Sequence, residues 1–161
     1  MKRYLTVMLA MILVVGCSAK TAQTQPQLKE DPAQLANRAW AALSEDSSAQ
    51  SLTAETACLL LDIPSKDIAA AYGFFDAESP QGAQLFLLQA AAERSPRLHN
   101  ELEERLELVR QTAAATKGKT LPEAEYGCLV AAGEWCALII PANMDDSRTK
   151  QARQIILQAF E

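Results

Sequence analysis

Apolar residues recur along most of this chain at intervals of three and four, which is the period of an amphipathic helix. The first such run follows Asp31-Pro32, a capping residue and a proline suited to the first helical turn. Its apolar positions are Leu35, Ala36, Ala39, Trp40 and Leu43. The spacing predicts a helix that ends between Ser44 and Ser48.

The same spacing predicts helices along the rest of the chain. A second helix is expected over 53–61, a third over 65–75 and a buried fourth over 84–92. A long amphipathic helix follows Ser95-Pro96 and closes at Lys117-Gly118, where glycine suits the left-handed cap. The last helix begins at Asp146 or Ser147. Its apolar stripe consists of Ala152, Ile155, Ile156, Ala159 and Phe160.

The segment from 121 to 141 has two interpretations. A helix, broken near its glycines, is favoured because every neighbouring segment is predicted to be helical. The alternative is a β-hairpin with Ala131-Ala132-Gly133 as its loop, which would place Cys128 opposite Cys136. With the helix preferred, the predicted fold class is all-α, as a compact helical bundle or helical-hairpin array of five to seven helices.

The first residues of the chain have a pattern of their own. Lys2 and Arg3 precede about a dozen apolar residues, too few for the roughly 20 that a membrane-spanning helix needs. The run ends in Val14-Val15-Gly16-Cys17, which resembles the lipobox of bacterial lipoproteins. The resemblance implies cleavage between Gly16 and Cys17 and acylation of Cys17, whose lipid would be the membrane anchor.

This resemblance divides the chain into a signal peptide over 1–16, Cys17 with a flexible tether to residue 30, and a helical domain over 31–161. The tether is polar, and by the scaling of flexible linkers it lets the domain range about 20 Å from the lipid. Ser18 stands where an Asp tends to retain enterobacterial lipoproteins in the inner membrane. By this analogy the protein is expected at the outer membrane, facing the periplasm.

The charge balance excludes some partners. The chain has 15 Lys and Arg and 20 Asp and Glu, and two of the cations leave with the signal peptide. The mature chain therefore carries 13 cations against 20 acids, a net charge of −7. Nucleic-acid binding needs a basic surface, so no nucleic-acid partner is expected. No polybasic segment is present to hold the domain against anionic lipid either.

Export would place Cys58, Cys128 and Cys136 in an oxidising compartment, where nearby thiols form disulfides. Three cysteines allow one intramolecular bridge at most. Eight residues along a helix span about 12 Å, so the helical interpretation of 121–141 favours a bridge from Cys58 to one of the other two. With one histidine and no CxxC motif, neither a metal site nor a cofactor is expected.

No catalytic motif stands out in the sequence, which lacks GxSxG, HExxH and a phosphate-binding glycine loop. The prediction is therefore a non-catalytic protein. His99 is interpreted as a solvated helix residue, and Glu101 and Arg105 as neighbours on the exposed side of the same helix. The candidates for a binding groove are the aromatic residues Tyr72, Phe74, Phe75 and Trp135.

Two resemblances bear on the function. Ala70, Phe74 and Ala77, followed by Pro80, are similar to the second helix of a tetratricopeptide repeat, which implies a concave face that binds a peptide. The overall plan is similar to secretin pilotins, small helical lipoproteins that bind a partner's segment between helices. We therefore expect a membrane-anchored binding or assembly module with an envelope protein partner. A cell-wall hydrolase is the less favoured alternative.

Overall fold

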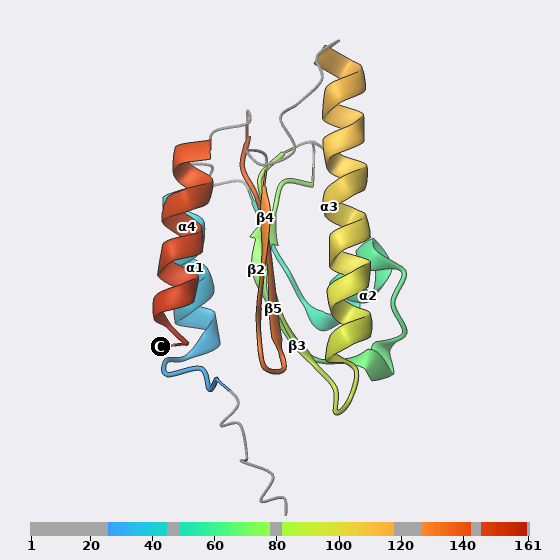
Figure 1. The fold of residues 1–161 in the computed structure, drawn as a ribbon, viewed down its shortest axis with the longest axis vertical. Helices are drawn as coiled ribbons and strands as arrows, with labels where there is room; N and C mark the ends of the chain where they lie inside the picture. The colour runs from blue at the N-terminus through green and yellow to red at the C-terminus, as the bar shows by residue number, and fades with distance from the viewer. Residues whose placement is uncertain (1–25, 45–48, 78–81, 118–126, 143–145, 161) are drawn as a thin grey trace, which may run out of the picture.

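The computed structural model describes residues 26–44, 49–77, 82–117, 127–142 and 146–160. In these ranges the chain forms four α-helices, a short 3-10 turn and five strands. The elements lie in three layers, with a sheet between two pairs of helices (Figure 1). The predicted all-α bundle or helical-hairpin array is therefore wrong, and the domain is a mixed α/β sandwich.

The sheet is antiparallel throughout, with the strand order β1-β2-β3-β5-β4. Its centre is β3 (Gln84–Ala90), which pairs with β2 (Ile68–Phe75) and β5 (Trp135–Ile140). The outer strands are the short β1 (Gln50–Ser51), beside β2, and β4 (Cys128–Ala132), beside β5. The longest strands are thus the innermost ones.

Helices cover both faces of this sheet (Figure 1). On one face lie α1 (Pro32–Leu43) and α4 (Asp146–Gln158), and on the other lie α2 (Ala54–Leu61) and the long α3 (Ser95–Lys117). All four helices lie where the apolar spacing predicts them. Their surroundings differ from the prediction, because they pack on a sheet rather than on one another alone.

The first two helices begin at side-chain caps. The carboxylate of Asp31 accepts a hydrogen bond from the amide of Gln34 at 2.9 Å, and Thr53 Oγ1 accepts one from the amide of Thr56 at 3.1 Å. Each cap satisfies an amide that has no partner within its helix, which is worth about 1 kcal/mol. Asp62, in the left-handed conformation, ends α2.

Two segments predicted as helices are strands. The segment 65–75 forms a 3-10 turn (Ser65–Asp67) followed by β2, and 84–92 contains β3. In a sheet covered on both faces, each strand is apolar on both sides, so the alternation that identifies a strand is lost. On β3, for example, Leu85 and Leu87 face α1 and α4, while Phe86 and Leu88 face α2 and α3.

The structure contradicts the tetratricopeptide resemblance, which requires a helix at this position. Ala70 and Phe74, which it placed on a helix, lie on β2. Ala77 follows that strand, and Pro80 lies outside the described residues. The similarity to pilotins also rested on an all-helical plan, which the sheet removes. Neither comparison supports a groove between helices of the expected kind.

The segment 127–140 is a hairpin, so the favoured helix is wrong there, while 121–126 lies outside the described residues. The register differs from the alternative too: Ala132 pairs with Trp135, which leaves a two-residue turn of Gly133 and Glu134. Gly133 has a φ of 62°, a conformation that glycine adopts without steric cost. Cys128 therefore lies opposite Ile139 and not opposite Cys136.

The core is divided by the sheet into two clusters. The cluster under α2 and α3 is built around the fully buried Phe86, Leu88, Leu98, Leu102 and Leu138. The cluster under α1 and α4 is built around Leu35, Leu43, Leu85, Leu87, Ile139 and Ile156. Each side chain of this size contributes about 1.5–3 kcal/mol when it leaves water, so both helical layers are firmly attached to the sheet.

The residues immediately before α1 contact the α1–α4 layer. The amide of Lys29 donates to the carbonyl of Ala159 at 3.0 Å, and Leu28 packs against the cluster under α1 and α4. Glu30 pairs with Arg38 at 2.6 Å. The last residues assigned to the tether are therefore attached to the α1–α4 layer.

Candidate functional site

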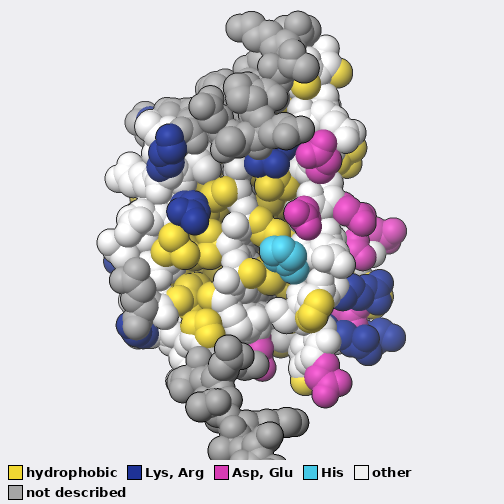
Figure 2. All heavy atoms as spheres, viewed as in Figure 1, with side chains coloured by type: hydrophobic (Ala, Val, Ile, Leu, Met, Phe, Trp, Pro, Cys, Tyr) yellow, Lys and Arg dark blue, Asp and Glu magenta, His cyan; other side chains and the backbone are white. Residues whose placement is uncertain are grey.

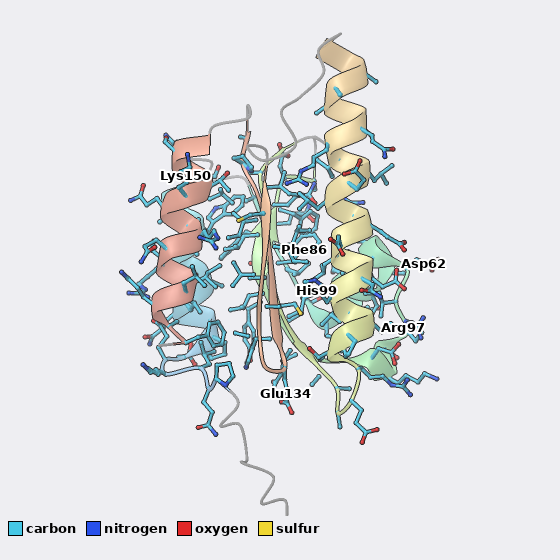
Figure 3. All side chains as sticks on the ribbon, in the orientation of Figure 1. Asp62, Phe86, Arg97, His99, Glu134 and Lys150 are labelled. Carbon is cyan, nitrogen blue, oxygen red and sulfur yellow. The ribbon has the colours of Figure 1, made fainter. Side chains whose placement is uncertain are left out.

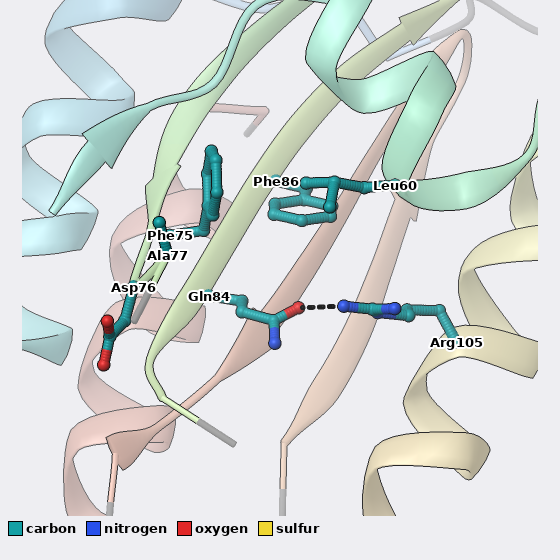
Figure 4. A pocket seen from close by; sticks show the side chains of 7 residues that line it. All are labelled: Leu60, Phe75, Asp76, Ala77, Gln84, Phe86 and Arg105. Carbon is teal, nitrogen blue, oxygen red and sulfur yellow. Dashed lines mark hydrogen bonds between the residues drawn. The ribbon is translucent and has the colours of Figure 1, made fainter. Parts of the chain in front are cut away.

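A pocket of about 200 Å³ lies between α2, α3 and the ends of β2 and β3 (Figure 4). Apolar side chains form most of its wall. The lining residues are Leu60, Phe75, Asp76, Ala77, Gln84, Phe86 and Arg105. Phe75 and Phe86 meet edge to face, with ring centroids 6.5 Å apart. The pocket thus combines an aromatic wall with a few polar groups, the usual composition of a ligand site.

Arg105 is the cation of this pocket. Its Nη2 donates to Gln84 Oε1 at 3.4 Å, and Gln84 is itself 3% exposed (Figure 4). Arg105 Nε is buried and has no hydrogen-bond partner. Burial lowers the pKa of the Arg105 guanidinium below its usual value, although a guanidinium remains charged at physiological pH.

No carboxylate among the described residues is paired with this cation. Asp76 lies at the opposite end of the pocket, and its carboxylate points away from Arg105 (Figure 4). The Asp76 side chain lies over Gly82, where an added Cβ would be 2.4 Å from Asp76 Oδ2. Glu101, one turn before Arg105, approaches Arg97 at 3.8 Å instead. The predicted Glu101–Arg105 neighbours are not an ion pair.

A second, shallower hollow of about 430 Å³ shares Leu60 and Arg105 with the first. It is also lined by Leu61, Asp62, Glu101, Glu104 and Leu108. Leu108 is 55% exposed, and Leu59, next to Leu60 on α2, is 79% exposed. We call the two hollows together the α2–α3 groove. It has an apolar floor, one cation and an acidic rim.

Exposure of Leu59 contradicts one expectation from the sequence. The run 57–61 reads as apolar on all sides, which predicts complete burial. In the structure Ala57 and Leu61 are buried, whereas Leu59 is the most exposed large apolar residue in the described part of the chain. Together with Leu108, which lines the second hollow, it leaves exposed apolar surface on the α2–α3 layer.

The four aromatic residues predicted to line a groove do not line one pocket together. Phe74 packs on Trp40 with ring centroids 5.5 Å apart, and Tyr72 packs on Trp135 at 6.2 Å. These contacts belong to the α1–α4 side of the sheet. Only Phe75 faces the other side and lines the pocket. Trp135 borders a separate shallow hollow of about 270 Å³ beside Leu28 and Glu134.

None of the three described cysteines forms a disulfide. Cys58 lies on α2, Cys128 faces the α1–α4 side and Cys136 faces the α2–α3 side. The predicted bridge from Cys58 is therefore absent, and the hairpin alternative fails because Cys128 and Cys136 face opposite sides of the sheet. Burial raises the pKa of the Cys136 thiol to about 11, against a smaller opposing effect of its hydrogen bond with Ser95. Such a thiol is a poor nucleophile at neutral pH.

His99 is half-buried rather than solvated. It lies on α3 facing β5, and its Nδ1 is buried without a hydrogen-bond partner (Figure 3). Among the described residues no group of three His, Cys, Asp or Glu side chains is placed to hold a metal ion. His99 is therefore a second polar group, after Arg105, that the fold leaves incompletely satisfied.

A buried carboxylate fixes one end of α3. Asp67 is 1% exposed at its side chain, and its oxygens lie 3.0 Å from Arg97 Nη1 and 3.4 Å from Arg94 Nε. The amide of Ala91 also donates to the Asp67 carbonyl at 2.9 Å. Both arginines are about half exposed, so these contacts tie the 3-10 turn to the start of α3 rather than form a ligand site.

The face that looks onto β4 has a different character. Figure 2 shows hydrophobic side chains gathered between the α4 layer and α3, with the histidine beside them and acidic side chains along α3. Of the described strands, β4 pairs only with β5. Its residues are apolar, but four of the five are buried or half-buried. This edge is therefore largely shielded by the helices on either side.

The chain has no match among protein-family models, curated proteins or solved structures. Gly16 and Cys17, the predicted cleavage and lipidation residues, lie outside the described residues. No described helix is both long and apolar enough to cross a membrane. The features that bear on function are therefore the geometry of the α2–α3 groove and the pattern of the first residues.

Sequence reasoning missed Arg105 as a site residue. It was placed on the exposed side of its helix, yet it follows Leu98 by seven residues and Leu102 by three. Those intervals put it on the same helix face as the two leucines, which are fully buried. The sequence signal for this site is a cation on the same helix face as the apolar residues that face the core.

Proposed function

We propose that this protein is an envelope lipoprotein, anchored through Cys17, that acts as a non-catalytic binding or assembly module. Its domain would bind a segment of an envelope partner protein in the α2–α3 groove. The observation that carries this proposal is the combination in that groove of a half-buried Arg105, which pairs with no described carboxylate, and apolar surface open to solvent. Both features are costly in an isolated domain and are relieved by a partner.

The anchor supports a role at a membrane surface. The lipobox-like Val14-Val15-Gly16-Cys17 would attach the domain to lipid, and the polar segment after it would hold the domain about 20 Å away. A mature net charge of −7 keeps the domain from lying on anionic lipid. This arrangement suits a module that meets its partner in the periplasm, and Ser18 favours the outer membrane as its position.

A cell-wall hydrolase is the competing function. The rim of the groove holds Asp62, Glu101 and Glu104, and glycoside hydrolysis needs two carboxylates on either side of the scissile bond. Glu101 and Glu104 come from the same helix, however, and Glu101 already approaches Arg97 at 3.8 Å. Only Asp62, at the end of α2, comes from a second element, whereas the apolar pocket beside Arg105 is formed by several elements and supports the binding function better.

Crosslinking in intact cells tests the proposal. The wild-type protein and Cys17→Ser are crosslinked, extracted with detergent and purified, and their partners are identified by mass spectrometry. We expect one stoichiometric envelope protein with the wild type and much less of it with Cys17→Ser, which should also leave the membrane fraction. Recovery of the protein alone from both forms, or equal membrane association of both forms, would contradict the proposal.

A further inference from the structure

We propose that the α2–α3 groove binds the C-terminal residue of a partner protein, whose free α-carboxylate pairs with Arg105. The apolar side chain of that residue would occupy the hollow lined by Phe75 and Phe86. This inference rests on the proposed function, because it names the chemistry of the segment that the module binds. It is argued from the charge, the size and the rim of the groove.

The charge of the groove points to a carboxylate. Arg105 contributes a fixed positive charge, and its only described polar contact is the 3.4 Å hydrogen bond to Gln84. Its Nε is buried without an acceptor. A carboxylate presents two oxygens in the geometry that matches the Nε and Nη donors of a guanidinium. Because Nε itself is shielded from solvent, a carboxylate bound in the groove would pair with the guanidinium through its Nη donors.

The size of the pocket indicates what is attached to that carboxylate. The apolar hollow beside Arg105 measures about 200 Å³ and is walled by Leu60, Phe75 and Phe86. A cavity of about 150 Å³ in another protein holds one benzene molecule, so this hollow has room for one large side chain. A long acyl chain would exceed it. The C-terminal residue of a protein offers the required pair, an apolar side chain of this size beside a carboxylate.

The acidic residues at the edge of the groove favour a ligand with a single negative charge over a polyanion. Asp62, Glu101 and Glu104 line the neighbouring hollow, which also contains Arg105. Carboxylates at this position repel a phosphate or another polyanion more strongly than they repel a single α-carboxylate that pairs with Arg105. Leu108, 55% exposed on the same hollow, offers apolar contact to the residue that precedes the C-terminus. The second hollow therefore provides space for the residue that precedes the C-terminus of a bound partner.

Peptide binding to the full-length protein in detergent micelles tests the inference. The probe is a fluorescein-labelled Ala-Ala-Ala-Phe with a free carboxylate, compared with the same peptide ending in an amide. We expect the free acid to bind at least tenfold more tightly, measured by fluorescence anisotropy. Arg105→Met should remove this difference, and Arg153→Met, on the exposed side of α4, should keep it.

A second variant is needed in case Arg105→Met, at a half-buried position, does not fold. Ala77 lines the pocket but is exposed, so Ala77→Trp should fill the hollow without disturbing the core. We expect this variant to bind both peptides with the same low affinity. Its thermal unfolding temperature should stay unchanged. Tight binding of the free acid by Ala77→Trp would place the ligand elsewhere and overturn the inference.

Three results would contradict the inference. They are equal affinity for the acid and the amide, an unchanged preference in Arg105→Met, and competition by octanoate as strong as that of the peptide acid. The last would indicate a free fatty acid as the ligand. If the peptides fail while cell crosslinking still captures a stoichiometric partner, only this inference fails. If no partner is captured either, the proposed function fails with it.

Discussion

Arg105 on α3 reaches across to Gln84 on β3, and their 3.4 Å hydrogen bond is the only described polar contact of the guanidinium. The two side chains connect a helix to the central strand through a pocket that is otherwise apolar. A cation in such a place is unfavourable for folding unless something else compensates it. We therefore expect the half-buried Arg105 to lower the free energy of unfolding of the domain.

The first prediction is that Arg105→Met does not destabilise the domain. Methionine fills a similar space without a charge, and replacing a desolvated cation by an apolar side chain is often neutral or stabilising. We expect the free energy of unfolding, from urea titration, to stay the same or rise by about 1 kcal/mol. A loss of more than about 1 kcal/mol would mean that Arg105 serves the fold rather than a ligand.

The second prediction concerns the ion pairs of Asp67. Asp67→Asn removes the charge that faces Arg94 and Arg97 at 3.4 and 3.0 Å. Because both arginines are 48% exposed and remain hydrated, we expect a loss of about 2 kcal/mol, below the 3–5 kcal/mol typical of fully buried pairs. Urea unfolding measures it, and the exposed Asp62→Asn serves as the control. Equal stability of the two variants would refute a structural role for this contact.

The third prediction is that Gly73→Ala prevents stable folding. Gly73 lies on β2 with a φ of 139°, and a Cβ there would lie 1.9 Å from the carbonyl oxygen of Leu85 on β3. The strands β2 and β3 would have to separate, at a cost of about 3 kcal/mol or more. Circular dichroism of Gly73→Ala beside Ala69→Ser, an exposed change on the same strand, checks this. A wild-type melting curve for Gly73→Ala would contradict the strand register.

The fourth prediction follows from the pKa of Cys136, raised by burial from 9.0 to about 11. Above pH 9 the unfolded chain releases the thiol proton while the folded chain retains it, so stability falls as the pH rises towards 11. The full effect is about 2–3 kcal/mol, at roughly 1.4 kcal/mol per pH unit.

Urea unfolding at pH 7.5 and pH 10.5 measures this dependence under reducing conditions. Cys136→Ala should reduce the difference between the two pH values, because the remaining titrations are common to both proteins. Cys128→Ala provides the comparison with a thiol on the other face of the sheet. If Cys136→Ala and the wild type lose the same stability between these pH values, the buried thiol does not titrate as described.

The helices were predictable and the sheet was not, for a physical reason. Helical periodicity survives in a helix that packs by one face, as the buried Leu35, Ala39 and Leu43 of α1 show. In β3 almost every residue is buried, and its sequence Leu85-Phe86-Leu87-Leu88 carries no alternation. Only tertiary pairing distinguishes such a strand from a buried helix.

The candidate site was harder to predict than the fold. Of the aromatic residues predicted to line a groove, only Phe75 lines the pocket, and the other three are half-buried against the α1–α4 side of the core. The groove instead depends on Gln84 and Arg105, which come from β3 and α3 and meet only because those elements pack together. A sequence shows which residues share a helix face, but it does not show which strand lies beneath that face.

Photocrosslinking from within the α2–α3 groove tests whether this groove binds a partner protein. A photoreactive residue replaces Leu108 beside Arg105, and in a matched control it replaces Gln154, exposed on α4 in the opposite layer. In intact cells we expect Leu108 to crosslink to one envelope protein, Gln154 to crosslink to none, and the product to diminish when Ala77→Trp is added. Equal crosslinking from both positions, or none from Leu108, would contradict a binding function for the α2–α3 groove.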